Sequence, residues 1–158
     1  MDQAIMNALD SVSGSQASAY IMMGGNRYCF MQIYSFESNM DINVATVPIL
    51  GKTGKGNKPA GWTGTWKGTA HYNQSIMRQV LLEYKRTGRM EPFDIQISNE
   101  DLTSSVGRQT VILKGCLLKG GILAKFDANA DNLDEDIEGT FDDWELPETF
   151  SMLNGMQQ

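Results

Sequence analysis

The sequence predicts a mainly β protein: two packed antiparallel sheets that form a β-sandwich or small barrel, with one flanking α-helix. Three observations favour this fold class. Long stretches alternate apolar and polar residues with a period of two, as half-buried antiparallel strands do. Only one segment has the spacing of an amphipathic helix, and glycine-rich turns separate the strands. The 158 residues suffice for a single domain with a buried core.

The N-terminal residues 1–17 are predicted to form an arm that is loose unless something holds it. A short strand over 18–23 and a tight turn at 24–26 follow, which together indicate a hairpin. The next extended run covers 27–50, and its second half has one apolar and one polar face. Because strands usually have about 5–6 residues, this run must bend into two strands or project beyond the domain.

The segment 51–61 is predicted to be an extended basic loop with Lys52, Lys55, Lys58 and Pro59 among four glycines. An alternating strand over 62–72 follows. Trp62 and Trp66 share one face of that strand with two glycines, so we expect the aromatic rings to lie across bare backbone. Both tryptophans are assigned to the core.

The segment 75–87 is the one predicted helix. Ile76, Val80 and Tyr84 recur at four-residue spacing, which places them on one buried stripe. All three are assigned to the core. Asn73 or Ser75 can cap the start of the helix, and Gly88 suits its end.

The remaining chain is predicted to be strands, followed by a C-terminal tail. The strands cover 92–97, 108–118, 122–127 and 133–144; Pro147 ends the regular structure, and 151–158 is the tail. The last strand carries an acidic face, formed by Asp134, Asp136, Glu138 and Asp142. A regular row of carboxylates is more typical of a solvated face than of a catalytic pair, whose two pKa values must differ in a pocket.

The composition excludes several classes of function. A net charge of -6 is poorly suited to gripping nucleic acid through its phosphates. No apolar run reaches the roughly 20 residues of a membrane span, and the N-terminus lacks the pattern of a secretory signal, so we expect the protein to start in the cytoplasm. With His71 as its single histidine, the chain offers no Ser/His/Asp triad or zinc signature. We predict no enzyme activity and no cofactor, with Cys29 and Cys116 as reduced core thiols.

Two motifs resemble ligand sites but lack essential residues. The triplet GKT at 51–53 is not a phosphate loop, because Thr46 stands where that motif needs its first glycine and no helix follows. Asp127, Asn129, Asp131 and Glu138 occupy ligand positions of a calcium loop. Asn132 stands where that loop needs glycine, and the flanks are predicted to be strands. A monomeric calcium-binding β-domain is therefore kept only as an alternative.

Long strands with exposed edges, a basic loop and an acidic strand indicate an obligate homo-oligomer. Exposed edges promote aggregation in a monomer, whereas a closed ring of subunits pairs them. Elution as a large assembly or as a small chelator-sensitive monomer separates this prediction from the calcium-binding alternative.

The order of segments resembles the contractile phage tail tube proteins of PBSX-like prophages, myophages and R-type bacteriocins, over residues 13–150. Ser13-Gly14 precedes the first hairpin, and the stretch SFESNMDINVATVPILG precedes the basic loop. GWTGTWKGTAHY, MRQVLLEYKRTG, PFDIQI and VILKGCLL follow in that order. The chain closes with LDEDIEGTFDDWELPETF. A tube protein of a type VI secretion system shares the architecture and is the second alternative.

This resemblance implies a structural subunit that forms hexameric rings, stacked into a hollow conduit for DNA or ions. It implies assembly in the host bacterial cytoplasm with sheath, baseplate and tape measure proteins, and DNA that passes through the lumen without specific binding. We expect Lys52, Lys55, Lys58 and Pro59 to contact a neighbouring subunit or ring. The acidic face is expected to line the lumen or to face the sheath, and the choice between phage and bacteriocin stays open.

Overall fold

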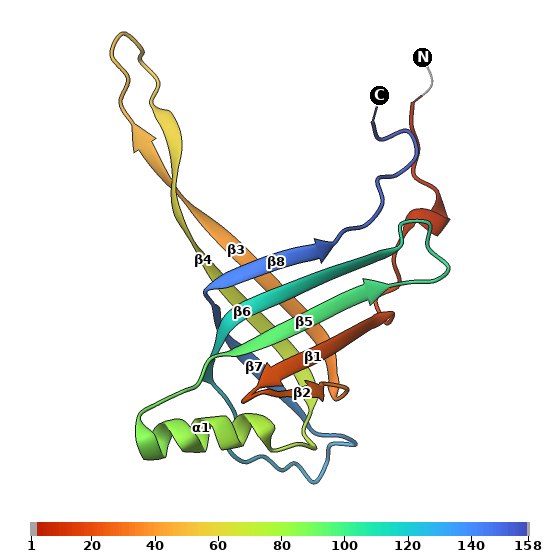
Figure 1. Ribbon diagram of the computed structural model, residues 1–158, viewed down its shortest axis with the longest axis vertical. Coiled ribbons are helices and arrows are strands. Elements are labelled where there is room, and N and C mark those ends of the chain that lie inside the picture. Colours follow the sequence, from red (N-terminus) through yellow and green to blue (C-terminus); the bar gives the residue numbers. More distant parts are fainter. Residues whose placement is uncertain (1–2, 158) are drawn as a thin grey trace.

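The computed structural model describes residues 3–157, in which eight strands, one α-helix and a short 3-10 helix are found (Figure 1). The mainly β fold with a single helix is confirmed. The elements are η1 (Ala8–Asp10), β1 (Ala17–Met23), β2 (Asn26–Cys29), β3 (Ile33–Val47), β4 (Gly56–His71), α1 (Ile76–Thr87), β5 (Phe93–Glu100), β6 (Arg108–Gly120), β7 (Asp134–Phe141) and β8 (Asp143–Glu148).

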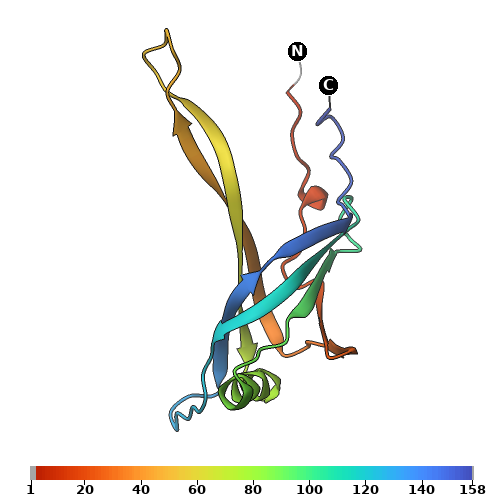
Figure 2. The ribbon, with the colours of Figure 1, turned by 60° about the vertical axis from the view of Figure 1, so that its left-hand side comes forward.

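The strands form one hydrogen-bonded path in the order β2-β1-β5-β6-β7-β4-β3, and β8 pairs with β6 off this path. The first part of β6 lies between β5 and β8, and its end pairs with β7, which in turn pairs with β4. All of these pairs are antiparallel. The two predicted sheets are therefore two layers joined through β6 and β7, and the layers diverge towards the free end of the β3–β4 hairpin (Figure 2).

The segment predicted as one strand over 133–144 is two strands. The chain bends at Asp142, whose N–H donates to the carbonyl oxygen of Lys114 at 3.0 Å. After this bend β8 pairs with β6, whereas the pairing with β4 has ended at Phe141. Pro147 lies inside β8 and does not end the regular structure as predicted. Because β6 is the one strand that pairs with β8 among the residues described, the edge position tolerates the missing N–H of proline.

The predicted strand over 122–127 is wrong, because residues 121–133 form an irregular loop. The neighbouring strand β7 pairs with β4 along its whole length and with β6 only over residues 138–140, and residues 122–127 form no ladder with β7. The Nζ atom of Lys125 donates instead to the carbonyl oxygen of Asp134 at 2.8 Å.

The predicted hairpin turn is confirmed. Gly24 and Gly25 connect β1 to β2 with φ angles of 59° and 80°, and Met23 pairs with Asn26. Positive φ at both central residues defines a type I′ turn, which glycine adopts without steric cost. Ser75 occupies the position before α1 but makes no capping bond with its side chain, and Gly88 ends the helix.

The core lies between the two layers and is closed at one end by α1. Its largest fully buried side chains are Trp66, Phe93, Ile21, Ile95, Leu113 and Cys116. Aromatic rings cross bare glycine backbone as predicted. A Cβ atom on Gly139 would lie 2.8 Å from the ring of Trp66, and one on Gly64 would lie 2.5 Å from the ring of Phe141.

The two cysteines lie in different environments. Cys116 is buried, and burial raises the pKa of its thiol to about 12. Cys29 is exposed, which corrects the prediction that both are core thiols. It lies on β2, a four-residue edge strand whose side chains are all exposed.

Candidate assembly surfaces

The outward face of β3, β4 and β7 is polar throughout. Alternation along these strands brings serine, threonine, asparagine and charged residues to this face, while Phe36, Trp66 and Ile137 point to the core. Its carboxylates are Glu37, Asp41, Asp134, Asp136 and Glu138, and its basic residues are Lys67 and His71. The face is therefore strongly acidic.

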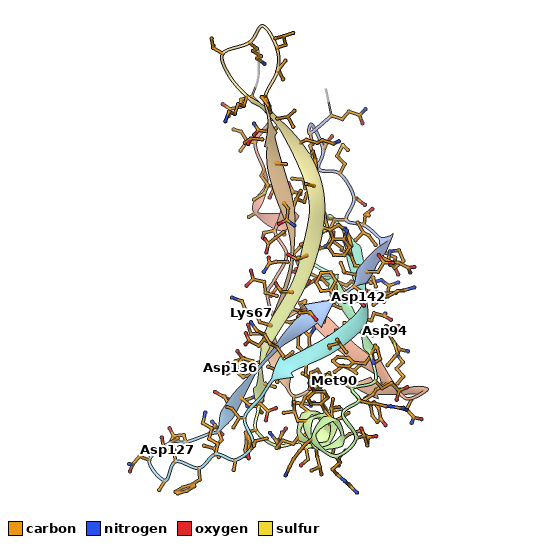
Figure 3. All side chains as sticks on the ribbon, turned by 90° about the vertical axis from the view of Figure 1, so that its left-hand side faces the viewer. Lys67, Met90, Asp94, Asp127, Asp136 and Asp142 are labelled. Atoms are coloured by element: carbon orange, nitrogen blue, oxygen red, sulfur yellow. The ribbon has the colours of Figure 1, made fainter. Side chains whose placement is uncertain are left out.

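Cross-strand pairs order this polar face. Lys67 lies in register between Glu37 and Glu138, and its Nζ atom is 3.7 Å from Oε2 of Glu37. One row further along, the hydroxyl of Thr69 donates to Oδ1 of Asp136 at 3.1 Å. Figure 3 shows Lys67 and Asp136 projecting from the same side of the sheet. Such pairs stabilise neighbouring strands modestly, since the side chains are exposed.

The end of the polar face carries the single histidine. Nδ1 of His71 lies 3.4 Å from Oδ1 of Asp134, and the rings of His71 and Tyr34 have centroids 5.0 Å apart. A hydrogen bond to Asp134, together with burial and the charges of Asp134 and Asp136, raises the pKa of the Tyr34 hydroxyl.

Asp142 does not belong to the acidic face, which corrects the prediction of a row of four. It sits at the bend between β7 and β8, and its Oδ2 atom is 3.0 Å from the position of a Cβ on Gly115. Figure 3 places Asp142 beside Asp94, on the opposite side from Asp136. The alternation of the row stops at Phe141, where β7 ends.

The β3–β4 hairpin projects far beyond the strands that pack at its base (Figure 1). The two strands pair from Ile33–Ala70 to Val47–Gly56, whereas β7 covers β4 only from Gly64 to His71. The predicted loop 51–61 is therefore shorter in the structure, because residues 56–61 belong to β4 and the turn spans 48–55. Lys52 and Lys55 lie in the turn, and Lys58 and Pro59 lie in β4; all four are exposed.

One face of the projecting hairpin is apolar and exposed. Its large side chains are Met40, Ile42, Val44 and Trp62. Trp62 is 37% exposed, so it is not a core residue of the single chain as predicted. Its partner across the hairpin is Ile42. The face still meets β8 at Met40, whose Sδ atom accepts the indole N–H of Trp144 at 3.2 Å, whereas Ile42 and Val44 beyond it are 54% and 62% exposed. The ring of Trp62 contacts that of Phe141, with a centroid distance of 6.0 Å.

The helix α1 docks on the sheet through one apolar stripe and one ion pair. Met77 is buried, and Ile76 and Val80 pack against the core. Tyr84 is 54% exposed and is not a core residue as predicted, because the C-terminal half of α1 extends past the sheet (Figure 1).

The ion pair joins Arg78 on α1 to Glu135 on β7. Nη1 of Arg78 is 2.8 Å from Oε2 of Glu135, and the two side chains are 18% and 8% exposed. The guanidinium also lies over the ring of Tyr72, 4.4 Å from its centroid. Sequence reasoning missed this pair. The sequence feature that could have revealed the pair is Glu135, a charged residue on the otherwise apolar face of β7.

Both terminal segments are anchored to the turn between β5 and β6. The N–H of Ser13 donates to Oδ2 of Asp101 at 3.0 Å, and the N–H of Ser105 donates to the carbonyl oxygen of Leu9 at 3.0 Å. The N–H of Ser151 donates to the carbonyl oxygen of Val106 at 2.7 Å. The predicted arm is thus held by hydrogen bonds, and both ends of the described chain lie on one side of the molecule (Figure 1).

Hydrogen bonds from the arm and the turn lower the pKa of two carboxyl groups. For Asp101 the donors are the hydroxyl and N–H of Thr103 and the N–H of Ser13. For Asp10 they are the Ser105 hydroxyl and the N–H of Asn7. Both carboxylates therefore fasten the arm in their charged forms.

The ligand positions of the calcium-loop motif, which supported only the alternative of a calcium-binding domain, are not brought together. Asp127 lies in the loop 121–133 (Figure 3), whereas Glu138 lies on β7 in register with Lys67. Among residues 3–157, no three His, Cys, Asp or Glu side chains are grouped as metal ligands. Within the same residues, no helix is both long and apolar enough to cross a membrane.

The chain matches a protein family and two individual relatives. The model of the family described as phage tail tube protein matches residues 4–148. The chain is 26% identical over 146 residues to the phage-like element PBSX protein XkdM of Bacillus subtilis (strain 168), an alignment that covers 92% of this chain and 97% of that protein. It is equally 26% identical over 143 residues to the uncharacterized protein YqbM of the same strain, covering 90% and 95% of the two chains.

Solved structures share the fold at low identity. One chain of the PVC sheath–tube complex, an extracellular contractile injection system in its extended state, superimposes with a TM-score of 0.67 at 11% identity, covering 86% of this chain and 90% of that one. One chain of the anti-feeding prophage baseplate gives a TM-score of 0.63 at 13% identity, with coverages of 92% and 97%.

Proposed function

The chain belongs to the phage tail tube protein family, and from this we propose that six copies close into a ring and that the rings stack into the hollow inner tube of a contractile tail. In this proposal the protein is a structural subunit without enzymatic activity, assembled in the bacterial cytoplasm. Tail sheath, baseplate and tape measure proteins are its partners. DNA or ions pass along the lumen without specific binding.

The observation that carries this proposal is the long open edge at β3. This strand of 15 residues ends the sheet path, with β4 as its one partner among the residues described. Its outer edge presents unpaired backbone N–H and C=O groups, which in a free domain would promote aggregation. Pairing of that edge with a strand of the neighbouring subunit closes the sheet around a ring.

We assign the polar face of β3, β4 and β7 to the lumen. If β3 continues the sheet into the next subunit, this face becomes one surface of the closed cylinder, opposite the core and α1. Its excess of carboxylates, led by Asp134, Asp136 and Glu138, gives that surface a negative potential. Phosphates would be repelled from such a wall, so DNA would slide rather than bind.

The hairpin and the two anchored ends are the contacts between subunits in this proposal. Residues 18–150 form the tube domain, and the arm 1–17 and the tail 151–158 extend from it. The exposed apolar face at Ile42, Val44 and Trp62 is buried against a neighbour, and Lys52, Lys55, Lys58 and Pro59 contact a neighbouring ring or subunit. Burial of a large apolar side chain contributes roughly 1.5–3 kcal/mol, which gives the ring its cohesion.

Shortening the hairpin tests this role. Val47 pairs with Gly56 at its end, so residues 48–55 can be replaced by Asn-Gly, which suits a two-residue turn. We expect a folded chain with an unchanged circular dichroism spectrum that forms monomers or single rings and no tubes in electron micrographs. Full-length tubes from this variant would show that the tip is dispensable.

Neutralising the polar face tests the lumen assignment. We expect D134N/D136N/E138Q to slow DNA release from assembled tails, or ion conductance in a particle without DNA, while sheath assembly stays normal. The matched control E83Q/E91Q/D143N removes three exposed carboxylates from other surfaces and should change neither. Loss of sheath assembly with unchanged release would place the acidic face on the outside.

A further inference from the structure

We propose that the hairpin tip of one copy docks on the loop 121–133 of the next copy along the tube. This inference rests on the proposed function, because it assumes that copies stack, and it names the surface that receives the tip. The tip is defined as residues 48–58 and the receiving loop as residues 121–133.

The two segments lie at opposite ends of the molecule. Figure 1 has the longest axis vertical, with the hairpin tip at one end and the loop between β6 and β7 at the other. Figure 3 shows Asp127 of the receiving loop at the end opposite the tip. A contact between different surfaces at opposite ends is heterologous, so it repeats from copy to copy and builds an extended stack.

The charges of the two segments are complementary. Lys52, Lys55 and Lys58 are exposed, and none of them forms an ion pair within residues 3–157. The sequence between 42 and 63 has no acidic residue that could balance them. On the receiving loop, Asp127 and Asp131 are exposed and likewise have no ion pair there.

The one lysine of the receiving loop, Lys125, offsets only one of the two aspartates, so the loop keeps a net formal charge of -1. The Nζ atom of Lys125 donates to the backbone carbonyl of Asp134 at 2.8 Å, which directs it towards the start of β7. Oδ1 of Asp127 accepts the N–H of Asn129 at 3.0 Å, so one oxygen is tied to the loop and the other is available to a partner.

Exposed apolar side chains accompany both sets of charges. Leu50 at the tip is fully exposed, and Ile49 is 46% exposed. On the receiving loop, Leu123 and Phe126 are 72% and 92% exposed. An apolar centre with a charged rim is the usual make-up of a protein interface. The tip and the receiving loop therefore complement each other twice: the leucine of the tip can pack on the phenylalanine of the loop, and the lysines of the tip can pair with its aspartates. This double match identifies a second copy of this chain as the partner that the loop binds.

Charge reversal tests the contact. We expect K52E/K55E/K58E to form rings but no stacks, because the reversed tip repels the aspartates. D127K/D131K should fail in the same way, and the chain carrying both sets of changes should stack again. Electron micrographs and sedimentation velocity at low salt, where charges are weakly screened, measure tube length. Thermal melts confirm that each variant folds like the parent.

A control variant separates this contact from a general effect of charge. E83K/E91K changes the net charge as D127K/D131K does, at two exposed residues on and after α1, and it should leave tube length unchanged. Mixing rings of the two single-set variants should also restore stacking, because each reversed surface then meets its complement.

The outcomes distinguish this inference from the proposed function. If the unaltered protein stays a single chain, the proposed function fails and this inference fails with it. If the unaltered protein forms tubes and D127K/D131K forms tubes of the same length, only the docking of the tip on the loop is refuted. Loss of stacking in both variants without rescue in the combined chain also refutes it, since the tip and the loop would then have different partners.

Discussion

Removing Arg78 should destabilise the fold far more than removing any other arginine of α1. The guanidinium is the one cation that forms an ion pair with Glu135 among the residues described. Glu135 lies on the core side of β7, where its side chain is only 8% exposed. In Arg78→Met the carboxylate would stay buried without its partner, and a buried unpaired charge is costly.

The magnitude follows from the burial of both groups. Breaking a buried ion pair by removing one partner costs about 3–5 kcal/mol, and in a chain of this size that lowers the Tm by about 6–20 °C. Replacing both residues with apolar ones of similar volume, in R78M/E135L, removes the uncompensated charge. The double variant should therefore regain most of the stability that R78M loses.

A double-mutant cycle measures this coupling. Urea unfolding of the parent, R78M, E135L and R78M/E135L gives the four free energies, and R86M serves as control because Arg86 is exposed on the same helix. We expect R86M to change the stability by less than about 0.5 kcal/mol. A loss below about 1 kcal/mol in R78M would refute the argument, since it would show that the pair is effectively solvated.

Three further predictions concern the core, the thiols and the arm. Gly139→Ala should prevent folding, measured as loss of soluble protein, because a Cβ atom there would overlap the carbonyl oxygen of Leu117 on β6; soluble G139A with a parental Tm would contradict the close packing. In the native protein Cys29 should react with a thiol reagent while Cys116 reacts only after unfolding, since burial raises the pKa of Cys116 to about 12. Rapid modification of both thiols in the native chain would contradict this prediction. The folded-state pKa of Asp101 is lowered from 3.8, so its carboxylate stabilises the anchored arm above that pH and the stabilisation is lost as the pH falls below it. The protection factor of the Ser13 amide, which is its exchange rate relative to the intrinsic rate at the same pH, should fall in that range, and D101A should show the lower protection already at neutral pH; a protection factor that is independent of pH would refute the anchor.

The strands and the faces of the sheet were largely predictable from sequence, because alternation depends on local backbone geometry. It predicted the polar face at Asp134, Asp136 and Glu138 and the apolar face at Trp66. It also predicted aromatic rings over glycine, since glycine at every second position beside tryptophan leaves the backbone bare. The turn 24–25 and the helix were predictable for the same local reasons.

What the sequence could not reveal is which parts of each face are covered. Trp62 and Trp66 have the same pattern around them, yet only Trp66 lies where the second layer reaches. Tyr84 continues the stripe of α1 beyond the edge of the sheet. Asp142 continues the acidic alternation in the sequence, but the chain bends there, where the pairing with β4 ends and the pairing of β8 with β6 begins. These outcomes depend on contacts between elements that are distant in sequence.

The central claim is that the β3 edge is completed by another copy of the chain, and microscopy of the pure protein tests it most directly. Negatively stained preparations at high concentration should contain six-fold rings or hollow cylinders of uniform width built from this chain alone. A compact, fully folded single chain in the same preparations, with no larger species in sedimentation velocity, would contradict the claim.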